Sequence, residues 1–293
     1  MKFKFWGVRG SIATPGPSTV KYGGNTTCIE IRTDDGDLII LDAGTGIHML
    51  GQQLLQQLPI TAHIFITHTH WDHIQGLPFF APMFIPGNSL KLFGGQDPLT
   101  HEGIERALNV QLQDSYFPVG ETELNASVEY NTIKAGETIR IGNAEITSIL
   151  LSHSGLNFGY RIDCDHQSLF FTGDYEPLHN IYRPEDSQYA TSQAFIDDKL
   201  KDIMSLMQGV DALIMDASYT TEEYQVKTGW GHGTYDLALK HAALAKVKKL
   251  FLTHHEPTRT DQQLESIQQQ LIANNPMIDY DIIVAQEGVE NVL

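Results

Sequence analysis

The chain has 293 residues, of which 41% are hydrophobic, and its formal net charge is −17 from 36 acidic and 19 basic residues. This composition supplies enough apolar side chains for a substantial core and excludes a disordered protein. No apolar run reaches about eighteen residues, so no membrane-spanning helix is expected. The negative field would repel a long polyanion, which disfavours long nucleic acid as a partner, although a local basic patch could still bind one.

The first ten residues, MKFKFWGVRG, alternate apolar side chains with lysines and end at a glycine. This pattern predicts a β-strand rather than a signal peptide, which would carry a continuous apolar stretch. We therefore expect a cytoplasmic protein. The two cysteines, Cys28 and Cys164, lie in apolar, strand-like surroundings and are expected to be buried thiols, because two cysteines do not make a disulfide framework.

Strand-like and helix-like segments alternate along the whole chain, with no repeat and no linker that would mark a boundary. A single domain over residues 1–293 is therefore expected, with an irregular insertion at about 175–208 that could form a lid, a substrate wall or a surface excursion. The predicted strands are Ile29–Arg32, Leu38–Leu41, Ala62–Ile66, Glu145–Leu151, Ser168–Phe171, Ala212–Met215 and Lys249–Leu252, and the predicted helices are Ile47–Leu58 and Tyr235–Ala245.

Four of the predicted strands end just before a histidine or an aspartate. These residues are His153, Asp174, Asp216 and His254, and the strand Ala62–Ile66 leads directly into a further histidine cluster. Ligand sites in α/β proteins gather at the carboxyl ends of strands. Residues spread over most of the chain can therefore meet at one place.

The strongest motif is the segment THTHWDH, which supplies His68, His70, Asp72 and His73 within six residues. Imidazole and carboxylate are the common ligands of zinc and of similar metals. A tight loop after a strand can direct two of these side chains to one side and two to the other, so one loop can serve two metal ions. Asp72 is expected to act in catalysis as well as in metal binding.

Two metal ions need more ligands than one loop supplies. His153 follows an apolar strand between serines, Asp174 follows a glycine that allows close backbone approach, and His254 follows another apolar strand. The two carboxylate oxygens of Asp174 can bridge two cations. The predicted ligand set is therefore His68, His70, Asp72, His73, His153, Asp174 and His254.

This set resembles the signature of the metallo-β-lactamase superfamily: an HxHxDH motif, a downstream histidine, an aspartate in a Gly-Asp step and a late histidine after a strand. The resemblance extends over essentially the whole chain and implies an αββα sandwich, with two mixed sheets packed face to face and helices outside. It also implies the distribution of the ligands: His68, His70 and His153 at one metal, Asp72, His73 and His254 at the other, and Asp174 between them.

A second resemblance concerns the segment WGHGT around His232, which lies before a predicted helix. It looks like the His-Ser-Thr segment of the RNase Z and phosphoribosyl cyclic phosphodiesterase branch, where the histidine acts on the phosphate or the leaving group. Gly233 stands where that branch has serine. His255, Glu256 and Pro257 replace the serine-and-arginine segment of RNase Z, and no Gly/Pro-rich basic arm is found.

The predicted activity is hydrolysis of a small phosphodiester, such as a cyclic nucleotide, by two divalent metal ions, with zinc expected and manganese or iron as alternatives. His232 would be a general acid or a phosphate ligand. An RNase Z-like ribonuclease, or a hydrolase of lactam, lactone or thioester bonds, is the alternative. The oligomeric state is open, with a homodimer among the options.

The sequence leaves the roles of four further polar residues near the motifs open. Asp42 and Asp216, each at a strand end, could orient ligand imidazoles or could cap a turn. Arg9 and Asn25 could contact substrate, but no pattern in the sequence requires it.

Overall fold

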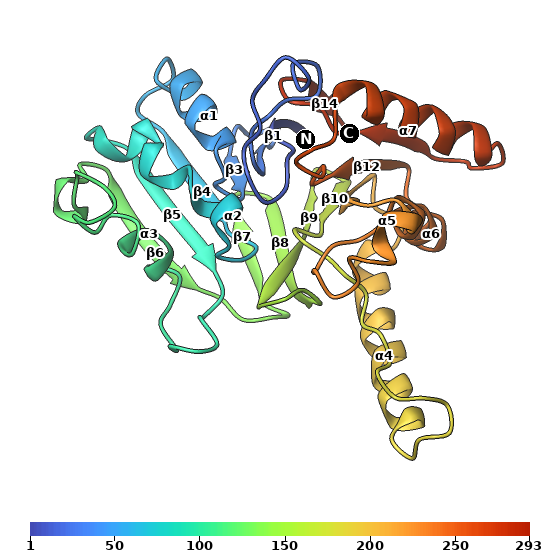
Figure 1. Cartoon of the computed structure of the whole chain (residues 1–293). Helices are drawn as coiled ribbons and strands as arrows, with labels where there is room; N and C mark the ends of the chain where they lie inside the picture. The colour runs from blue at the N-terminus through green and yellow to red at the C-terminus, as the bar shows by residue number, and fades with distance from the viewer.

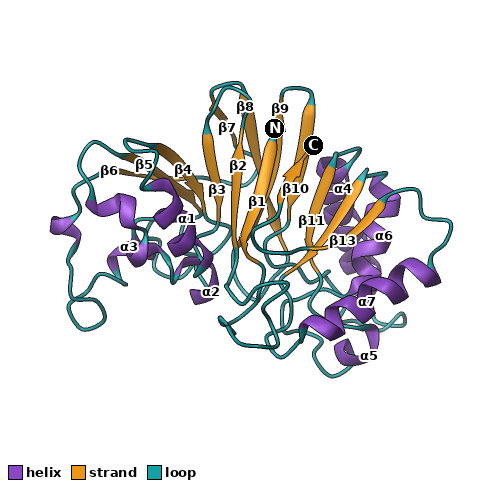
Figure 2. Ribbon diagram, turned by 90° about the horizontal axis from the view of Figure 1, so that it is seen from above, coloured by secondary structure: helices purple, strands orange, loops and turns teal.

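The structure is a computed structural model that describes residues 1–293, and it contains two seven-stranded sheets that pack face to face (Figures 1 and 2). The first sheet has the strand order β14-β1-β2-β3-β4-β5-β6 and the second has the order β13-β12-β11-β10-β9-β8-β7. Each sheet mixes parallel and antiparallel pairs: β1, β2 and β3 are antiparallel neighbours, whereas β3 to β6 are parallel.

The strands of the first sheet are β1 (Lys2–Gly7), β2 (Cys28–Arg32), β3 (Leu38–Leu41), β4 (Thr61–Phe65), β5 (Ser89–Gly94), β6 (Ser127–Thr132) and β14 (Glu290–Val292). Those of the second sheet are β7 (Thr138–Ile141), β8 (Ala144–Leu151), β9 (Asn157–Cys164), β10 (Gln167–Phe171), β11 (Ala212–Asp216), β12 (Lys249–Thr253) and β13 (Asp281–Val284). The α-helices are α1 (Gly46–Leu54), α2 (Trp71–Ile74), α3 (Arg106–Asn109), α4 (Tyr189–Met207), α5 (Thr221–Tyr224), α6 (Tyr235–Ala245) and α7 (Asp261–Asn274). Short 3-10 turns occur at Leu77–Phe79, Ala81–Phe84 and Glu121–Glu123.

The central core lies between the two sheets and is built by the inward side chains of both. Phe3 of β1 packs edge to face on Phe251 of β12 with ring centroids 5.1 Å apart, and Phe65 of β4 packs in the same way on Tyr160 of β9. Two outer cores cover the remaining faces, one under α1 and one under α4, α6 and α7. Because a sheet buried on both faces must be apolar on both, β3 and β11 are buried at every residue.

The layers therefore follow the order helices, sheet, sheet, helices, which is the predicted αββα sandwich (Figure 2). Every predicted strand is present, but the first predicted helix is shorter than Ile47–Leu58, because α1 ends at Leu54, ahead of Pro59. None of the helices is both long and apolar enough to span a membrane. Cys28 and Cys164 are buried free thiols, as expected.

The insertion at 175–208 is not irregular, because most of it forms α4, a helix of 19 residues that projects from the rest of the molecule (Figure 1). Ile203 and Met207, near its C-terminal end, are buried against the second sheet, while Phe195 farther out is exposed. The apolar positions Ile196, Leu200, Ile203 and Met207 recur at helical spacing, but the many polar residues between them hide the period in the sequence.

Candidate metal centre

The strand ends that carry the predicted ligands meet at one edge of the sandwich. Thr67 follows β4, and the THTHWDH loop then turns into the four residues of α2. His153, Asp174 and His254 follow β8, β10 and β12 of the second sheet. Two hydrogen bonds join the sheets here, from the backbone N–H of Phe158 and the hydroxyl of Tyr160 to backbone oxygens of Thr67 and Ile66. The convergence expected from the strand ends is thus present.

All seven predicted ligand residues fall into two adjoining groups in which the ligand atoms lie within 4.8 Å of one another. The first group is His68, His70, His153 and Asp174, and the second is Asp72, His73, Asp174 and His254.

Asp174 belongs to both groups and directs one oxygen to each. Its Oδ2 lies 3.6 Å from Nε2 of His68 and 3.7 Å from Nε2 of His153. Its Oδ1 lies 3.1 Å from Nε2 of His73 and 3.0 Å from Nε2 of His254. A carboxylate held in this way can bind one cation with each oxygen.

The chemistry of the site fits cations. Nε2 of His68, Nε2 of His73 and Oδ1 of Asp174 are buried without a hydrogen-bond partner, which is costly unless another species binds them. The centre also buries four carboxylates, and none of them is paired with a lysine or an arginine; they are Asp42, Asp72, Asp174 and Asp216. Buried charges need compensation, and two divalent cations would carry as many positive charges as these four groups carry negative ones.

Four histidines are oriented through their outward ring nitrogen. Nδ1 of His73 lies 2.8 Å from Oδ2 of Asp42, and Nδ1 of His68 lies 3.1 Å from the hydroxyl of Thr67. Nδ1 of His153 lies 2.8 Å from the carbonyl oxygen of Gly231, and Nδ1 of His254 lies 3.1 Å from the hydroxyl of Ser218. Such contacts fix the ring and leave Nε2 free for a metal.

His70 is turned the other way. Its Nδ1 lies 3.1 Å from Nε2 of His153, so Nδ1 is the atom that faces the first group.

The structure shows the contacts of the four polar residues whose roles the sequence left open. Asp42 contacts the ring of His73, and Asp216 contacts that of His232, so both orient imidazoles rather than merely cap turns. Arg9 cannot contact substrate because its side chain is fully buried; its Nε donates to the carbonyl oxygen of Gly23 and its Nη1 to that of Arg259. Asn25 donates from its side-chain amide to Glu287.

His232 lies beside both groups, but it is not one of the predicted metal ligands. Its Nδ1 is 2.9 Å from Oδ2 of Asp216 and 3.8 Å from Oδ2 of Asp174, and its ring stacks on that of His254 with centroids 4.6 Å apart. Burial opposes protonation of this ring, but the negative charges of Asp216 and Asp174 outweigh it and raise the pKa of His232 to about 9. Bound cations would act in the opposite direction on this pKa.

The loop that carries His232 is held by Glu176, which the sequence did not reveal. Its buried carboxylate accepts hydrogen bonds from the backbone N–H groups of Gly229 and Gly231 at 2.7 and 2.6 Å, and from the hydroxyl of Tyr224 at 2.5 Å. Gly231 has a φ of 91°, and a Cβ there would fall 2.3 Å from Nδ1 of His153, so only glycine fits.

The N-terminal segment closes the other side of the second group. The backbone N–H of Ser11 donates to Oδ2 of Asp72 at 2.7 Å. A Cβ on Gly10 would fall 2.2 Å from Cε1 of His254, so the backbone of this segment lies directly against the ring. Ser11, Ser218 and Glu176 are common residue types whose sequence neighbours give no sign of these contacts.

The fold and the two adjoining histidine–aspartate groups define the metallo-β-lactamase class of structures. Residues 38–255 match the profile of the beta-lactamase superfamily domain, and the chain belongs to this superfamily of hydrolases.

Individual proteins resemble this chain along nearly its whole length. Ribonuclease Z of Staphylococcus haemolyticus is 25% identical over 292 residues, which cover 88% of this chain and 92% of that protein. Among solved structures, the metallo-beta-lactamase fold protein YhfI from Bacillus subtilis aligns with a TM-score of 0.68 at 15% identity, covering 99% of each chain. A diphosphatase of the PhnP family aligns with a TM-score of 0.65 at 19% identity, covering 100% of this chain and 97% of the other. The structural matches establish the shared fold.

Proposed function

We propose that this hydrolase is a phosphodiesterase with two metal ions that acts on a small phosphodiester such as a cyclic nucleotide. In this proposal His68, His70 and His153 hold one ion, Asp72, His73 and His254 hold the other, and Asp174 bridges them. Zinc suits the imidazole-rich set best, with manganese or iron as alternatives. When bound, the ions supply Lewis acidity toward water and the phosphoryl oxygens.

The observation that carries the proposal is the position of His232. It lies against both groups, and Asp216 engages its Nδ1 at 2.9 Å, which leaves Nε2 free to face a substrate. Asp216 stabilises the protonated ring, so His232 can give a proton to the departing alkoxide of an ester. Positioned general acids are worth about 10²–10⁴-fold in rate. A thiolate leaves without a proton, so thioester hydrolysis gives this residue no such task, whereas a lactam or a lactone would use a general acid as well.

Ribonuclease Z relatives make an RNA substrate the second candidate. The overall charge of −17 and the projecting segment disfavour it, because residues 177–208 contain five acidic and three basic side chains. Phosphate backbones are bound by clustered lysines and arginines, and this segment would repel them. A small phosphodiester needs no such surface. A cytoplasmic location stays a prediction from the sequence, and a homodimer stays one option for the oligomeric state.

The test is metal analysis of the purified protein combined with a substrate panel. The panel contains cyclic nucleotides, a bis-nitrophenyl phosphate, a precursor tRNA, a lactam, a lactone and a thioester. We expect two equivalents of metal and the highest kcat/KM on a small phosphodiester, with the Asp174→Ala variant inactive on every member. Turnover of only the lactam, lactone or thioester would refute the phosphodiesterase, and preference for the tRNA would favour the ribonuclease.

A further inference from the structure

A cavity of about 360 Å³ opens beside the first group of candidate ligands. His68 and His70 form part of its wall, and residues 95–111, which follow β5 and include α3, form most of the rest. Pockets for small ligands have volumes of about 300–1,000 Å³, so this one suits a single compact group. Its continuity with the ligand residues means that a molecule bound at the metals would reach into it.

The interior of the cavity is largely apolar and carries no unpaired charge. Ile74, Ile104 and Leu156 contribute aliphatic surface. Its two charged residues, Asp97 and Arg106, neutralise each other, with Arg106 Nη1 donating to Asp97 Oδ2 at 3.0 Å. Such walls suit an uncharged group with extensive apolar surface.

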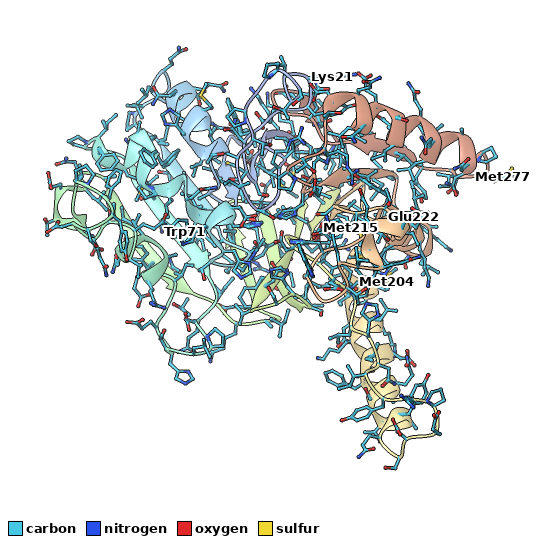
Figure 3. All side chains as sticks on the ribbon, viewed as in Figure 1. Lys21, Trp71, Met204, Met215, Glu222 and Met277 are labelled. Carbon is cyan, nitrogen blue, oxygen red and sulfur yellow. The ribbon has the colours of Figure 1, made fainter.

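Trp71 gives the cavity a flat aromatic wall. This tryptophan lies between the candidate ligands His70 and Asp72, at the start of α2, and Figure 3 shows it on the side of the molecule that carries the first sheet. Its side chain lines the cavity but is 75% exposed, although burial of an indole is strongly favourable. An exposed ring next to a reaction centre is suited to stacking on a planar group.

Two glutamines add hydrogen-bonding capacity to the cavity. The side-chain amide N–H of Gln96 donates to the carbonyl oxygen of His101 at 2.7 Å, and that of Gln111 donates to the carbonyl oxygen of Ala107 at 2.5 Å. Each bond uses one of the two N–H groups of the amide and leaves the amide oxygen free as an acceptor. A planar group with N–H donors at its edge would satisfy them.

We propose that this cavity, the Trp71 pocket, binds the nucleobase of the substrate, with Trp71 stacked on the base. The proposal rests on the proposed phosphodiesterase function and narrows its substrate class to nucleoside phosphodiesters, rather than sugar, glycerol or lipid phosphodiesters. A base is flat and uncharged, and its ring edge carries N–H groups. The apolar interior, the paired charges and the free amide oxygens match these three properties.

The kinetic test compares two substrates that share a leaving group, the p-nitrophenyl esters of adenosine 5′-phosphate and of methyl phosphate. The metal-loaded wild-type enzyme should prefer the nucleoside ester in kcat/KM, and the Trp71→Ala variant should lower that preference about 10-fold, mainly through KM. The Trp71→Phe variant, which keeps an aromatic face, should retain most of the preference. Phe195→Ala, which removes an exposed aromatic ring on α4 outside the cavity, should leave the preference unchanged.

A binding measurement provides a readout that does not depend on turnover. Adenosine 5′-phosphate and ribose 5-phosphate are titrated into the metal-loaded protein, and the first should bind at least about 10-fold more tightly in the wild type but not in Trp71→Ala. Equal affinities in the wild type would overturn the pocket assignment. If neither ester is hydrolysed but the affinities differ as expected, the phosphodiesterase proposal fails while the Trp71 pocket stands. If both esters are hydrolysed without preference, the Trp71 pocket assignment fails while the phosphodiesterase proposal stands.

Discussion

Nδ1 of His153 lies 2.8 Å from the carbonyl oxygen of Gly231, so a candidate metal ligand is hydrogen-bonded to the residue that precedes His232. This contact joins the first group of ligands to the loop that carries the candidate general acid. Movement of the loop would therefore disturb the orientation of His153, and loss of His153 would release the loop. In the proposed function, metal binding at His153 and proton donation by His232 would therefore be coupled through this one backbone oxygen.

The Asp174→Ala variant should lose hydrolysis and should lose metal at both positions, because each oxygen of Asp174 faces one of the two groups. Metal content by elemental analysis and kcat on a nitrophenyl phosphodiester are the measurements. Asp198→Ala, which changes an exposed aspartate on α4, is the matched control and should behave as the wild type. Full occupancy of both positions in Asp174→Ala would show that this carboxylate does not bridge.

The His232→Ala variant should keep both metals and lose about 10²-fold or more in kcat on a phosphodiester with an alkoxide leaving group. A nitrophenolate leaves without protonation, so the loss on a nitrophenyl ester should be smaller if His232 is a general acid. Equal losses on the two substrates would indicate phosphate binding instead. His48→Ala replaces an exposed histidine of α1 and serves as the control. Wild-type turnover on both substrates would remove His232 from the mechanism.

The Glu176→Ala variant should show that this carboxylate positions the His232 loop. Removal of the carboxylate leaves the N–H groups of Gly229 and Gly231 without their acceptor, and for the buried N–H of Gly231 this costs about 1–3 kcal/mol. We expect lower stability in urea and a kcat at least about 10-fold lower, because small displacements of a catalytic group are costly.

Glu176→Gln supplies the readout that separates positioning from simple destabilisation. It keeps one amide oxygen as an acceptor and should recover part of the rate lost in Glu176→Ala. Glu222→Ala, at an exposed glutamate of α5 that is labelled in Figure 3, is the control. Identical kcat values for Glu176→Ala and the wild type would contradict the positioning role.

His241 of α6 should make stability depend on pH. It is 3% exposed, its Nδ1 has no hydrogen-bond partner, and burial lowers its pKa to about 4. The pKa in the unfolded chain is about 6.5, so between these values the unfolded state binds more protons and stability falls as the pH falls. At pH 5 this contribution amounts to about 2 kcal/mol relative to pH 8.

His241→Leu removes that titration, so its stability in urea should improve relative to the wild type when the pH is lowered from 8 to 5. The comparison between the two proteins cancels the titration of the metal-binding residues. His48→Ala changes a histidine that is already exposed and should show no such relative gain. An unchanged difference between His241→Leu and the wild type at the two pH values would disprove the assignment.

The clustering of the candidate ligand residues could be predicted because histidine and aspartate at strand ends form an uncommon pattern, and the superfamily signature orders them. The contacts that hold these residues in place could not be predicted. Glu176 and Ser218 reach the site across 55 and 36 positions of sequence, and such contacts exist only once the sheets are packed. The sequence also left open whether Arg9 contacts substrate, and only the packed structure shows that its guanidinium is enclosed and donates to backbone oxygens.

The close approach of Gly10 to His254 brings together residues from opposite ends of the chain. His254 lies after β12, so the second group lacks one of its members until nearly the whole chain has been synthesised. The members of the first group all precede residue 175 and do not wait for that segment. A product truncated before residue 254 would therefore carry the histidine loop and the first group, but could complete only one of the two candidate metal positions.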